Sequence, residues 1–333
     1  MKIEENIPIS SLSTMQIGGI SKYVIEIHTK DDIVKAFNFV REKNLPFYFL
    51  GAGANTFGTD EGFSGAIILN KILGITEIPD GEFNVSGGEK WDDFVSFIVE
   101  RGYSGVECLA GIPGTVGAAP VQNIGAYGQE VKDTILSVEV FDFKTGKFKT
   151  LEKAECDFSY RHSIFNSNER GRYFILSVNF KLKKGEVEGE LYNSLQRYLD
   201  ENGISSRDPK IIAEAVRKIR DSKLPKPEEE ASSGSFFKNV YVSEDKVAEL
   251  DERGIPHHGT KVNTGWLIEN AGLKGKDFYG FKVSDKAALV LINESATSYS
   301  DLEKAVEEIS KAVEEKFGFS LEQEPNVIGL EQK

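Results

Sequence analysis

The apolar and polar positions in the first fifty residues follow the period of a strand, then of a helix, then of a second strand. Residues 23–28 alternate with a two-residue period, which is typical of a strand. Asp31 is placed to cap a helix whose apolar positions share one face: Ile33, Ala36, Phe37 and Val40. The apolar run 45–50 predicts the next strand, which ends at Gly51. This segment therefore predicts a βαβ-like unit followed by a sharp turn.

The pattern of apolar and polar residues changes twice in the middle of the chain. Residues 65–180 show mostly short strand patterns separated by glycine, with one helix predicted over 91–101. The stretch 183–207 is charged and polar, and a well-patterned amphipathic helix follows over 211–219. This shift predicts a domain boundary near residue 205.

The last third of the chain contains a long helix. Residues 221–234 hold two prolines, a charge run and small residues, so an irregular connection is expected there. Ser300 and Glu303 fit a capping box at the start of the helix. Its apolar stripe consists of Leu302, Ala305, Val306, Ile309, Val313 and Phe317. The patterns together predict an α+β fold, with a mixed first part and a second domain in which helices pack on a small sheet.

Composition and charge narrow the classes of function. A chain of 333 residues is long enough for two or three packed units, and 40% hydrophobic with 28% charged residues is ordinary for a globular protein. The formal net charge of −13 disfavours nucleic acid and anionic membranes as partners. An anionic small substrate would therefore need a locally basic pocket.

The start of the chain and its cysteines bear on compartment and metal binding. The segment MKIEENIPIS has no apolar core of an export signal, which predicts a cytoplasmic protein. Cys108 and Cys156 lie far apart and have no CxxC partner or nearby histidine, so they are predicted to be buried thiols and no metal site is expected.

Two glycine-rich segments are candidates for binding phosphate groups. Residues 51–55 are GAGAN, and residues 111–128 are GIPGTVGAAPVQNIGAYG. Glycine allows positive φ and close approach of the backbone, and successive inward amides can bind the oxygens of a pyrophosphate. The first segment lacks the third glycine of the dinucleotide fingerprint, and the second lacks the Gly-Lys-Ser/Thr ending of a P-loop. On the residues alone, tight turns and a ligand cradle stay equal alternatives.

Five ordered motifs together resemble one family. They are GAGAN, IPGTVGAAPVQNIGAYG, YRHSIF, SGSFFKN and the C-terminal LEQEP, and their order and spacing match over nearly the whole chain. The chain resembles the UDP-N-acetylenolpyruvoylglucosamine reductases, flavoenzymes of bacterial peptidoglycan precursor synthesis. The resemblance implies an FAD-binding fold of the vanillyl-alcohol-oxidase type in two lobes, about 1–68 and 69–205. A smaller α+β substrate-binding domain, 206–333, is implied to return its C-terminal segment to the active site.

The resemblance also implies a reaction and its small-molecule partners. NADPH would reduce the flavin, and the flavin would deliver hydride to the enolpyruvyl double bond of a UDP-sugar. A monomer is expected. The implied FAD-binding residues lie in the two glycine-rich segments: Gly51, Ala52, Gly53, Ala54, Asn55, Thr56, Gly111, Pro113, Gly114, Thr115, Gly117, Ala118, Ala119, Asn123, Gly125, Ala126, Tyr127 and Gly128.

Three residues are implied to be catalytic. Ser235 matches the proton donor of the family, although on the residues alone Ser233 and Ser235 could both be turn serines. Arg161 matches the arginine whose planar fork can hold a carboxylate and draw charge onto it. Glu324 matches the C-terminal glutamate, which could donate a hydrogen bond or relay a proton if burial raised its pKa. Glu322, two residues earlier, is the less favoured candidate.

Further residues follow from the resemblance, and some depart from it. Lys223 and Asn239 match residues that contact the substrate diphosphate, and Tyr192 matches a tyrosine that covers the substrate from a lid, here 183–207. The departures from the family pattern are His162, Asn166, Gln323, Pro325 and Asn326. Another oxidoreductase on the same scaffold and a non-catalytic UDP-sugar-binding homologue remain alternatives.

Overall fold

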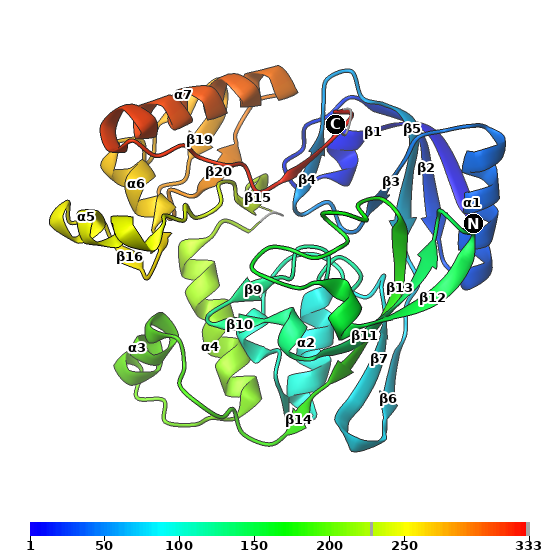
Figure 1. Ribbon diagram of the computed structural model, residues 1–333, viewed down its shortest axis with the longest axis horizontal. Helices are drawn as coiled ribbons and strands as arrows, with labels where there is room; N and C mark the ends of the chain where they lie inside the picture. The colour runs from blue at the N-terminus through cyan, green and yellow to red at the C-terminus, as the bar shows by residue number, and fades with distance from the viewer. Residues whose placement is uncertain (227–228, 331–333) are drawn as a thin grey trace. The chain divides into compact units, whose positions relative to one another are not determined.

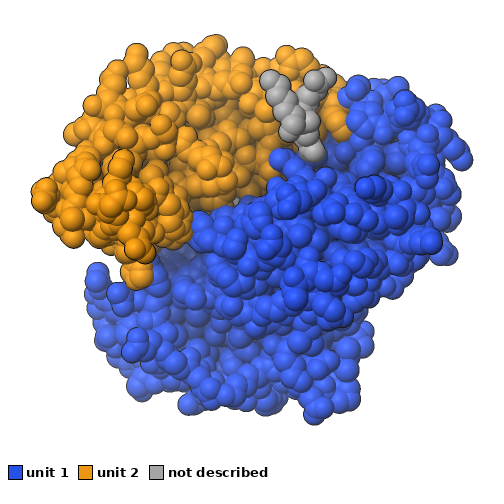
Figure 2. Space-filling model, viewed as in Figure 1, with its two compact units in different colours: residues 1–6, 22–52, 64–220 blue, residues 7–21, 53–63, 221–333 orange. Residues whose placement is uncertain are grey.

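The chain is described by a computed structural model that covers residues 1–226 and 229–330 (Figure 1). It divides into two compact units, coloured separately in Figure 2. Unit 1 comprises residues 1–6, 22–52 and 64–220, and unit 2 comprises residues 7–21, 53–63 and 221–333. The chain contains both helices and β-sheets, and the α+β class predicted from the sequence is confirmed. The boundary at residue 205 stays a prediction.

A four-stranded sheet and a helix form the first layer of unit 1. The helix α1 (Lys30–Glu42) packs its apolar face on the sheet, as the periodicity predicts. Its cap is Thr29, whose hydroxyl accepts from the amide of Asp32 at 3.2 Å, so the prediction that Asp31 is the cap was wrong. The strands lie in the order β1 (Lys2–Pro8), β2 (Ile20–Ile27), β5 (Phe63–Asn70) and β3 (Phe47–Leu50).

A five-stranded antiparallel sheet forms the second layer of unit 1. Three helices contribute to the apolar core on it: α2 (Trp91–Glu100), α3 (Asn193–Glu201) and α4 (Pro209–Lys223). The strands lie in the order β12 (Lys147–Glu152), β11 (Ile135–Asp142), β13 (Tyr173–Lys181), β7 (Glu82–Ser86) and β6 (Ile75–Ile78). Two short pairs complete the unit: β9 (Gly125–Ala126) with β10 (Gln129–Glu130), and β8 (Tyr103–Ser104) with β14 (Lys183–Lys184).

Unit 2 is built on a small sheet and the long helix α7 (Tyr299–Phe317). The hydroxyl of Ser298 caps α7 by accepting from the amide of Asp301 at 3.1 Å, so the predicted capping box at Ser300 was wrong. The sheet has the order β15 (Ser232–Ser235), β20 (Val290–Asn293), β19 (Phe281–Val283) and β18 (Asp277–Phe278). The remaining elements are α5 (Val247–Glu252), α6 (Thr264–Asn270), the pair β16 (His257–His258) and β17 (Lys261–Val262), and the pair β4 (Thr56–Gly58) and β21 (Asn326–Ile328).

Candidate active site

The two glycine-rich segments touch within unit 1. A Cβ atom added to Gly51 would lie 2.9 Å from the hydroxyl oxygen of Thr115 and 3.1 Å from the Cβ of Ala118. Contacts of that length leave no room for a side chain, so glycine permits the close approach. The two candidate ligand-binding segments therefore lie in direct contact at this point.

Thr115 carries a buried hydroxyl that has no hydrogen-bond partner among the described residues. The residue is only 8% exposed. Leaving a buried polar atom unpaired costs about 1–3 kcal/mol, so such atoms in native proteins mark a missing partner. Gly114, next to it, has φ of 138° and open space where a Cβ would stand. An open backbone beside an orphaned hydroxyl fits the oxygens of a bound cofactor, as expected for FAD.

The turn that carries Arg161 is fixed to the end of the glycine run. Arg161 has a left-handed backbone with φ of 52°, a conformation that costs a non-glycine residue about 1–3 kcal/mol and is concentrated at functional sites. Its Nη2 donates to the carbonyl of Gly125 at 3.0 Å, and its own carbonyl accepts from the side chain of Asn166 at 3.0 Å. The geometry thus joins the predicted carboxylate-binding arginine to the predicted FAD-binding run.

Asn123 and His162 bond to neighbouring parts of the chain around the Arg161 turn. Asn123 is fully buried; its side-chain amide donates to the carbonyl of Ser159 at 2.9 Å, and its side-chain oxygen accepts from the amide of Lys132 at 3.1 Å. His162 pairs with Asp157 across the turn at 3.4 Å. Asn123 therefore holds the Arg161 turn against the glycine run.

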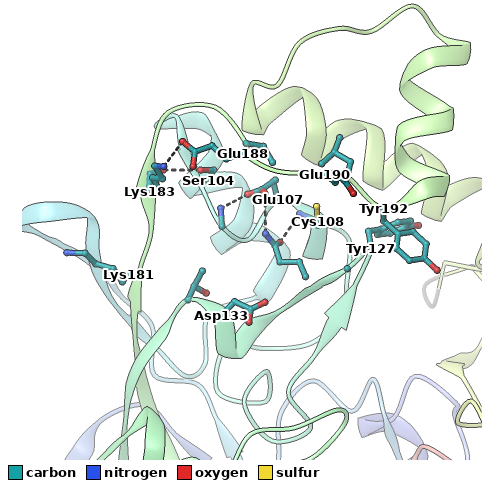
Figure 3. A pocket seen from close by; sticks show the side chains of 16 residues that line it. Ser104, Glu107, Cys108, Tyr127, Asp133, Lys181, Lys183, Glu188, Glu190 and Tyr192 are labelled. Atoms are coloured by element: carbon teal, nitrogen blue, oxygen red, sulfur yellow. Dashed lines mark hydrogen bonds and ion pairs between the residues drawn. The ribbon is translucent and has the colours of Figure 1, made fainter. Parts of the chain in front are cut away.

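A cavity of about 570 Å³ lies beside the end of the glycine run in unit 1 (Figure 3). Tyr127 and Tyr192 lie together at one side of it, with ring centroids 6.3 Å apart and planes at 81°. Burial raises the pKa of Tyr127, whereas Tyr192 is 54% exposed. The tyrosine that the sequence places on a lid thus contacts the run itself.

Glu107 and Cys108 also line this cavity. Glu107 is buried and accepts from the amide of Gly105 at 2.5 Å and from Gln129 at 3.2 Å. Burial raises the pKa of the Cys108 thiol to about 12, and Cys156 is likewise raised to about 12. A thiol in that state is not a nucleophile near neutral pH, and the prediction of buried thiols is confirmed.

Ser235 lies at the end of the bulged strand β15 in unit 2. Ser232 pairs with Ile292 and Ser235 with Val290, so three steps along β15 oppose two along β20. Gly234, at φ of 69°, takes up the extra residue. The hydroxyls of Ser232 and Ser233 are buried without a partner among the described residues, whereas Ser235 is only partly buried. The bulge therefore presents Ser235 toward a more open position than its neighbours.

The C-terminal segment pairs with the residues that follow Ser235. The amide of Lys238 donates to the carbonyl of Glu322, and the amide of Glu324 donates to the carbonyl of Phe236, both at 2.8 Å. Phe237 and Gln323 form the bridge between them. Glu322 forms an ion pair with Lys238. Glu324 is thus held one residue away from Ser235 along the paired segments, and Glu322 is engaged elsewhere.

The same C-terminal segment continues to the first glycine segment. Strand β21 runs parallel to β4, with Asn326 opposite Thr56, and its amide donates to the carbonyl of Asn55 at 3.0 Å. The side chain of Gln323 donates to the carbonyl of Pro325 at 2.7 Å and so stabilises the turn before β21. Residues 322–328 therefore connect the Ser235 strand with the end of GAGAN inside unit 2.

The predicted substrate residues are distributed over several elements. Lys223 is exposed at the last position of α4, and Tyr192 immediately precedes α3. Asn239 accepts from the amide of Thr264 at 3.3 Å, next to the start of α6. Unit 1 thus contains Arg161 and Tyr192, and the remaining predicted catalytic and substrate residues belong to unit 2.

Three side chains near the start of the glycine run did not emerge from the sequence. Asp92 accepts from the amide of Gly111 at 2.6 Å, Arg220 donates to the carbonyl of Gly111 at 3.1 Å, and Arg217 binds Asp92. The available signal was weak: an aspartate in the first turn of one predicted helix, and two arginines three residues apart, one inside and one just after another predicted helix.

Metal-binding clusters and membrane-spanning helices are both absent from residues 1–226 and 229–330. No group of three or more His, Cys, Asp or Glu in this part of the chain could hold a metal ion. None of its helices is long and apolar enough to cross a membrane.

Comparison with known proteins gives matches at both ends of the chain. Residues 21–152 match the family model described as an FAD binding domain, and residues 226–328 match that described as the C-terminal domain of UDP-N-acetylenolpyruvoylglucosamine reductase. The UDP-N-acetylenolpyruvoylglucosamine reductase of Bdellovibrio bacteriovorus is 38% identical over 98% of this chain and 99% of its own. That of Neisseria meningitidis serogroup A is 41% identical over 89% of this chain and 88% of its own.

A solved structure has a similar fold over the whole length. The crystal structure of UDP-N-acetylenolpyruvylglucosamine reductase from Thermus caldophilus superposes with a TM-score of 0.70 at 23% identity. The match covers 98% of this chain and 99% of that one. The likeness therefore extends through both compact units.

Proposed function

Because the chain belongs to the UDP-N-acetylenolpyruvoylglucosamine reductase family, we propose that it uses NADPH to reduce UDP-N-acetylglucosamine enolpyruvate to UDP-N-acetylmuramate in peptidoglycan precursor synthesis. The family resemblance, the FAD-binding fold and the class of FAD-dependent oxidoreductase predicted from the sequence are confirmed. The observation that carries the proposed mechanism is the pairing of the Glu324 segment with the residues that follow Ser235.

The residues proposed to hold FAD are those of the two glycine-rich segments. Their support is the contact of Gly51 with Thr115 and the orphaned Thr115 hydroxyl, which offers a hydrogen bond to a cofactor oxygen. A bound FAD would supply the hydride chemistry of the reaction, from NADPH to the enolpyruvyl double bond. The glycines next to Thr115 leave the backbone open to the oxygens of the cofactor.

Three side chains are proposed to complete the reduction. Arg161 binds the carboxylate of the substrate through its planar fork and stabilises the negative charge that develops beside it. Ser235 donates a proton to the carbon next to that carboxylate. Glu324, held opposite Phe236, is proposed to orient the Ser235 hydroxyl or return a proton to it.

Substrate binding is proposed to use charge at the end of α4. The ammonium of Lys223 is suited to a diphosphate oxygen, and the side chain of Asn239 is proposed to hydrogen-bond the same group. Tyr192 is proposed to leave Tyr127 and cover the bound sugar nucleotide, with residues 183–207 as the lid. These assignments concern a monomer that works in the cytoplasm, and gel filtration tests the oligomeric state.

The function is tested on purified protein. The expected preparation is yellow, its flavin absorbance bleaches with NADPH, and the colour returns when the enolpyruvyl sugar nucleotide is added. A colourless protein that FAD cannot reconstitute would contradict the proposal. A flavoprotein that NADPH reduces but that the sugar nucleotide does not reoxidise would indicate another oxidoreductase.

A further inference from the structure

The first glycine of the run, Gly111, is held by side chains on both of its backbone groups. Its amide donates to Asp92 Oδ1 at 2.6 Å, and its carbonyl accepts from Arg220 Nε at 3.1 Å. Asp92 is the second residue of α2, and Arg220 is on α4. Gly111 has φ of 71°, a left-handed conformation that glycine adopts without steric cost. Because glycine has no side chain, its own packing does not fix the direction of the peptide. The orientation of this peptide therefore depends on its neighbours.

The carboxylate of Asp92 is itself fixed by Arg217. Nε of Arg217 donates to both carboxylate oxygens, at 3.2 and 3.0 Å, and Nη2 donates to Oδ1 at 2.9 Å. Nη2 also donates to the hydroxyl of Ser96 at 2.7 Å, one turn further along α2. The side chains of Arg217 and Asp92 are 26% and 38% exposed, so this ion pair is partly shielded from water. Such a forked pair constrains direction as well as distance.

Trp91, the residue before Asp92, bonds the backbone on either side of Gly111. The indole of Trp91 donates to the carbonyl of Leu109 at 2.9 Å, and its backbone amide donates to the carbonyl of Gly114 at 3.1 Å. Trp91 is buried in the core, so it fixes these two points rigidly. Gly111 lies between them and is controlled by Asp92. A shift of the Asp92 carboxylate would therefore move the Gly111 peptide between these two fixed points.

We propose that Arg217 and Asp92 are positioning residues for the flavin: Arg217 aligns the carboxylate of Asp92, and Asp92 aligns the Gly111 peptide of the run. This inference rests on the proposed FAD site in the run. Binding sites need their contacting groups held within about 0.5 Å, and groups that act through others commonly supply that precision. Loss of either side chain should therefore weaken FAD binding without removing any group that contacts it.

The test is FAD affinity of the apoprotein, measured by quenching of flavin fluorescence in wild type and variants. Arg217→Ala is expected to raise the Kd for FAD about tenfold, the usual effect of losing a charge-assisted hydrogen-bonded pair. Arg217→Lys, which keeps the charge without the fork, is expected to recover part of that loss. Asp92→Asn keeps an acceptor for Gly111 and is expected to bind FAD more tightly than Asp92→Ala does.

Arg172→Ala is the matched control. Arg172 makes the same kind of fork with Asp142 in unit 1, at 3.0 and 2.7 Å, and it also binds Glu169 rather than a residue of the glycine run. Its removal should lower the midpoint of thermal unfolding and leave the Kd for FAD within about twofold of wild type. The control separates a positioning effect from general loss of stability.

Two results would overturn the proposal. One is an unchanged Kd for FAD in Arg217→Ala, and the other is a rise of the Kd in Arg172→Ala as large as that in Arg217→Ala. If Arg217→Ala gives no folded apoprotein, Arg217→Lys and Asp92→Asn decide, and an unchanged Kd in both also overturns it. Failure of the wild-type apoprotein to bind FAD would instead refute the proposed function, so the two failures are distinguishable.

Discussion

The backbone amide of Glu324 donates to the carbonyl of Phe236 at 2.8 Å, which fixes the C-terminal glutamate beside the residue that follows Ser235. Both residues belong to unit 2, and the pairing is made by backbone atoms. Substitution of the Ser235 or the Glu324 side chain therefore leaves this hydrogen bond in place. The chemistry of Ser235 can be tested without dismantling its surroundings.

Replacing Ser235 by alanine should separate the two half-reactions. NADPH should reduce the flavin at a near wild-type rate, because that step needs no proton from this hydroxyl. Reoxidation by the enolpyruvyl sugar nucleotide should slow by about 100-fold or more, as expected when a positioned general acid is lost. Stopped-flow absorbance of the flavin measures both rates.

Ser243→Ala, at an exposed serine of unit 2, is the control and should keep both rates. Equal slowing of the two half-reactions in Ser235→Ala would contradict its assignment as proton donor.

Replacing Arg161 by lysine should impair use of the enolpyruvyl substrate. Lysine keeps the charge but cannot make the planar two-point contact with a carboxylate, so kcat/KM should fall about 10- to 100-fold. Steady-state kinetics over a range of substrate concentrations measure the loss. Arg170→Lys, at an exposed position nearby, should behave as wild type, and an Arg161→Lys enzyme with unchanged kcat/KM would exclude a carboxylate contact.

Replacing Gly51 by alanine should separate the two glycine-rich segments. The added Cβ would lie 2.9 Å from the Thr115 hydroxyl, so Thr115 must move and FAD affinity should fall at least about tenfold. Titration of the apoprotein with FAD measures the change.

Gly171→Ala supplies the comparison. Gly171 has φ of 74° and open space around a Cβ, so alanine there should cost about 1–2 kcal/mol of stability through backbone strain alone. FAD affinity should stay at the wild-type value in Gly171→Ala, and equal weakening in both variants would refute the steric explanation.

The Arg172–Asp142 pair should make stability depend on pH. The hydrogen bonds from Arg172 lower the pKa of Asp142 to about 2 in the folded protein, below its value of about 3.9 in the unfolded chain. The folded state therefore binds fewer protons, and the stabilisation, complete above about pH 5, is lost as the pH falls through 4 toward 2. Urea unfolding from pH 7 to 2.5 should show the free-energy difference between wild type and Arg172→Ala shrinking in that range; a constant difference would contradict the linkage.

Elements with strong periodicity were predictable from the sequence, and weakly patterned ones were not. Helices α1, α2, α4 and α7 follow apolar stripes of the expected spacing. Helix α3 (Asn193–Glu201) was missed because its stretch is dominated by polar residues. Its buried face consists of Leu195 and Leu199 alone. Four apolar positions mark a helix where two do not.

Long-range pairing explains what the sequence could not provide about the site. Motif order identified the residues, but no local signal shows that Asn326 lies opposite Thr56 or that Gln323 bridges to Phe237. Such pairings depend on the register of segments far apart in the chain. The contact of Arg217 with Asp92 is equally non-local, and each residue alone resembles an ordinary charge on a helix surface.

The parallel pairing of β4 with β21 sets a limit on when this protein can mature. Residues 56–58 are synthesised well before their partner strand, residues 326–328. Pairing over so long a stretch of chain is slow, because loop closure precedes any gain from the contact. Unit 2 can therefore complete this pairing only after residue 328 has been synthesised, and a nascent chain halted before residue 326 would lack the partner strand for the end of its first glycine-rich segment.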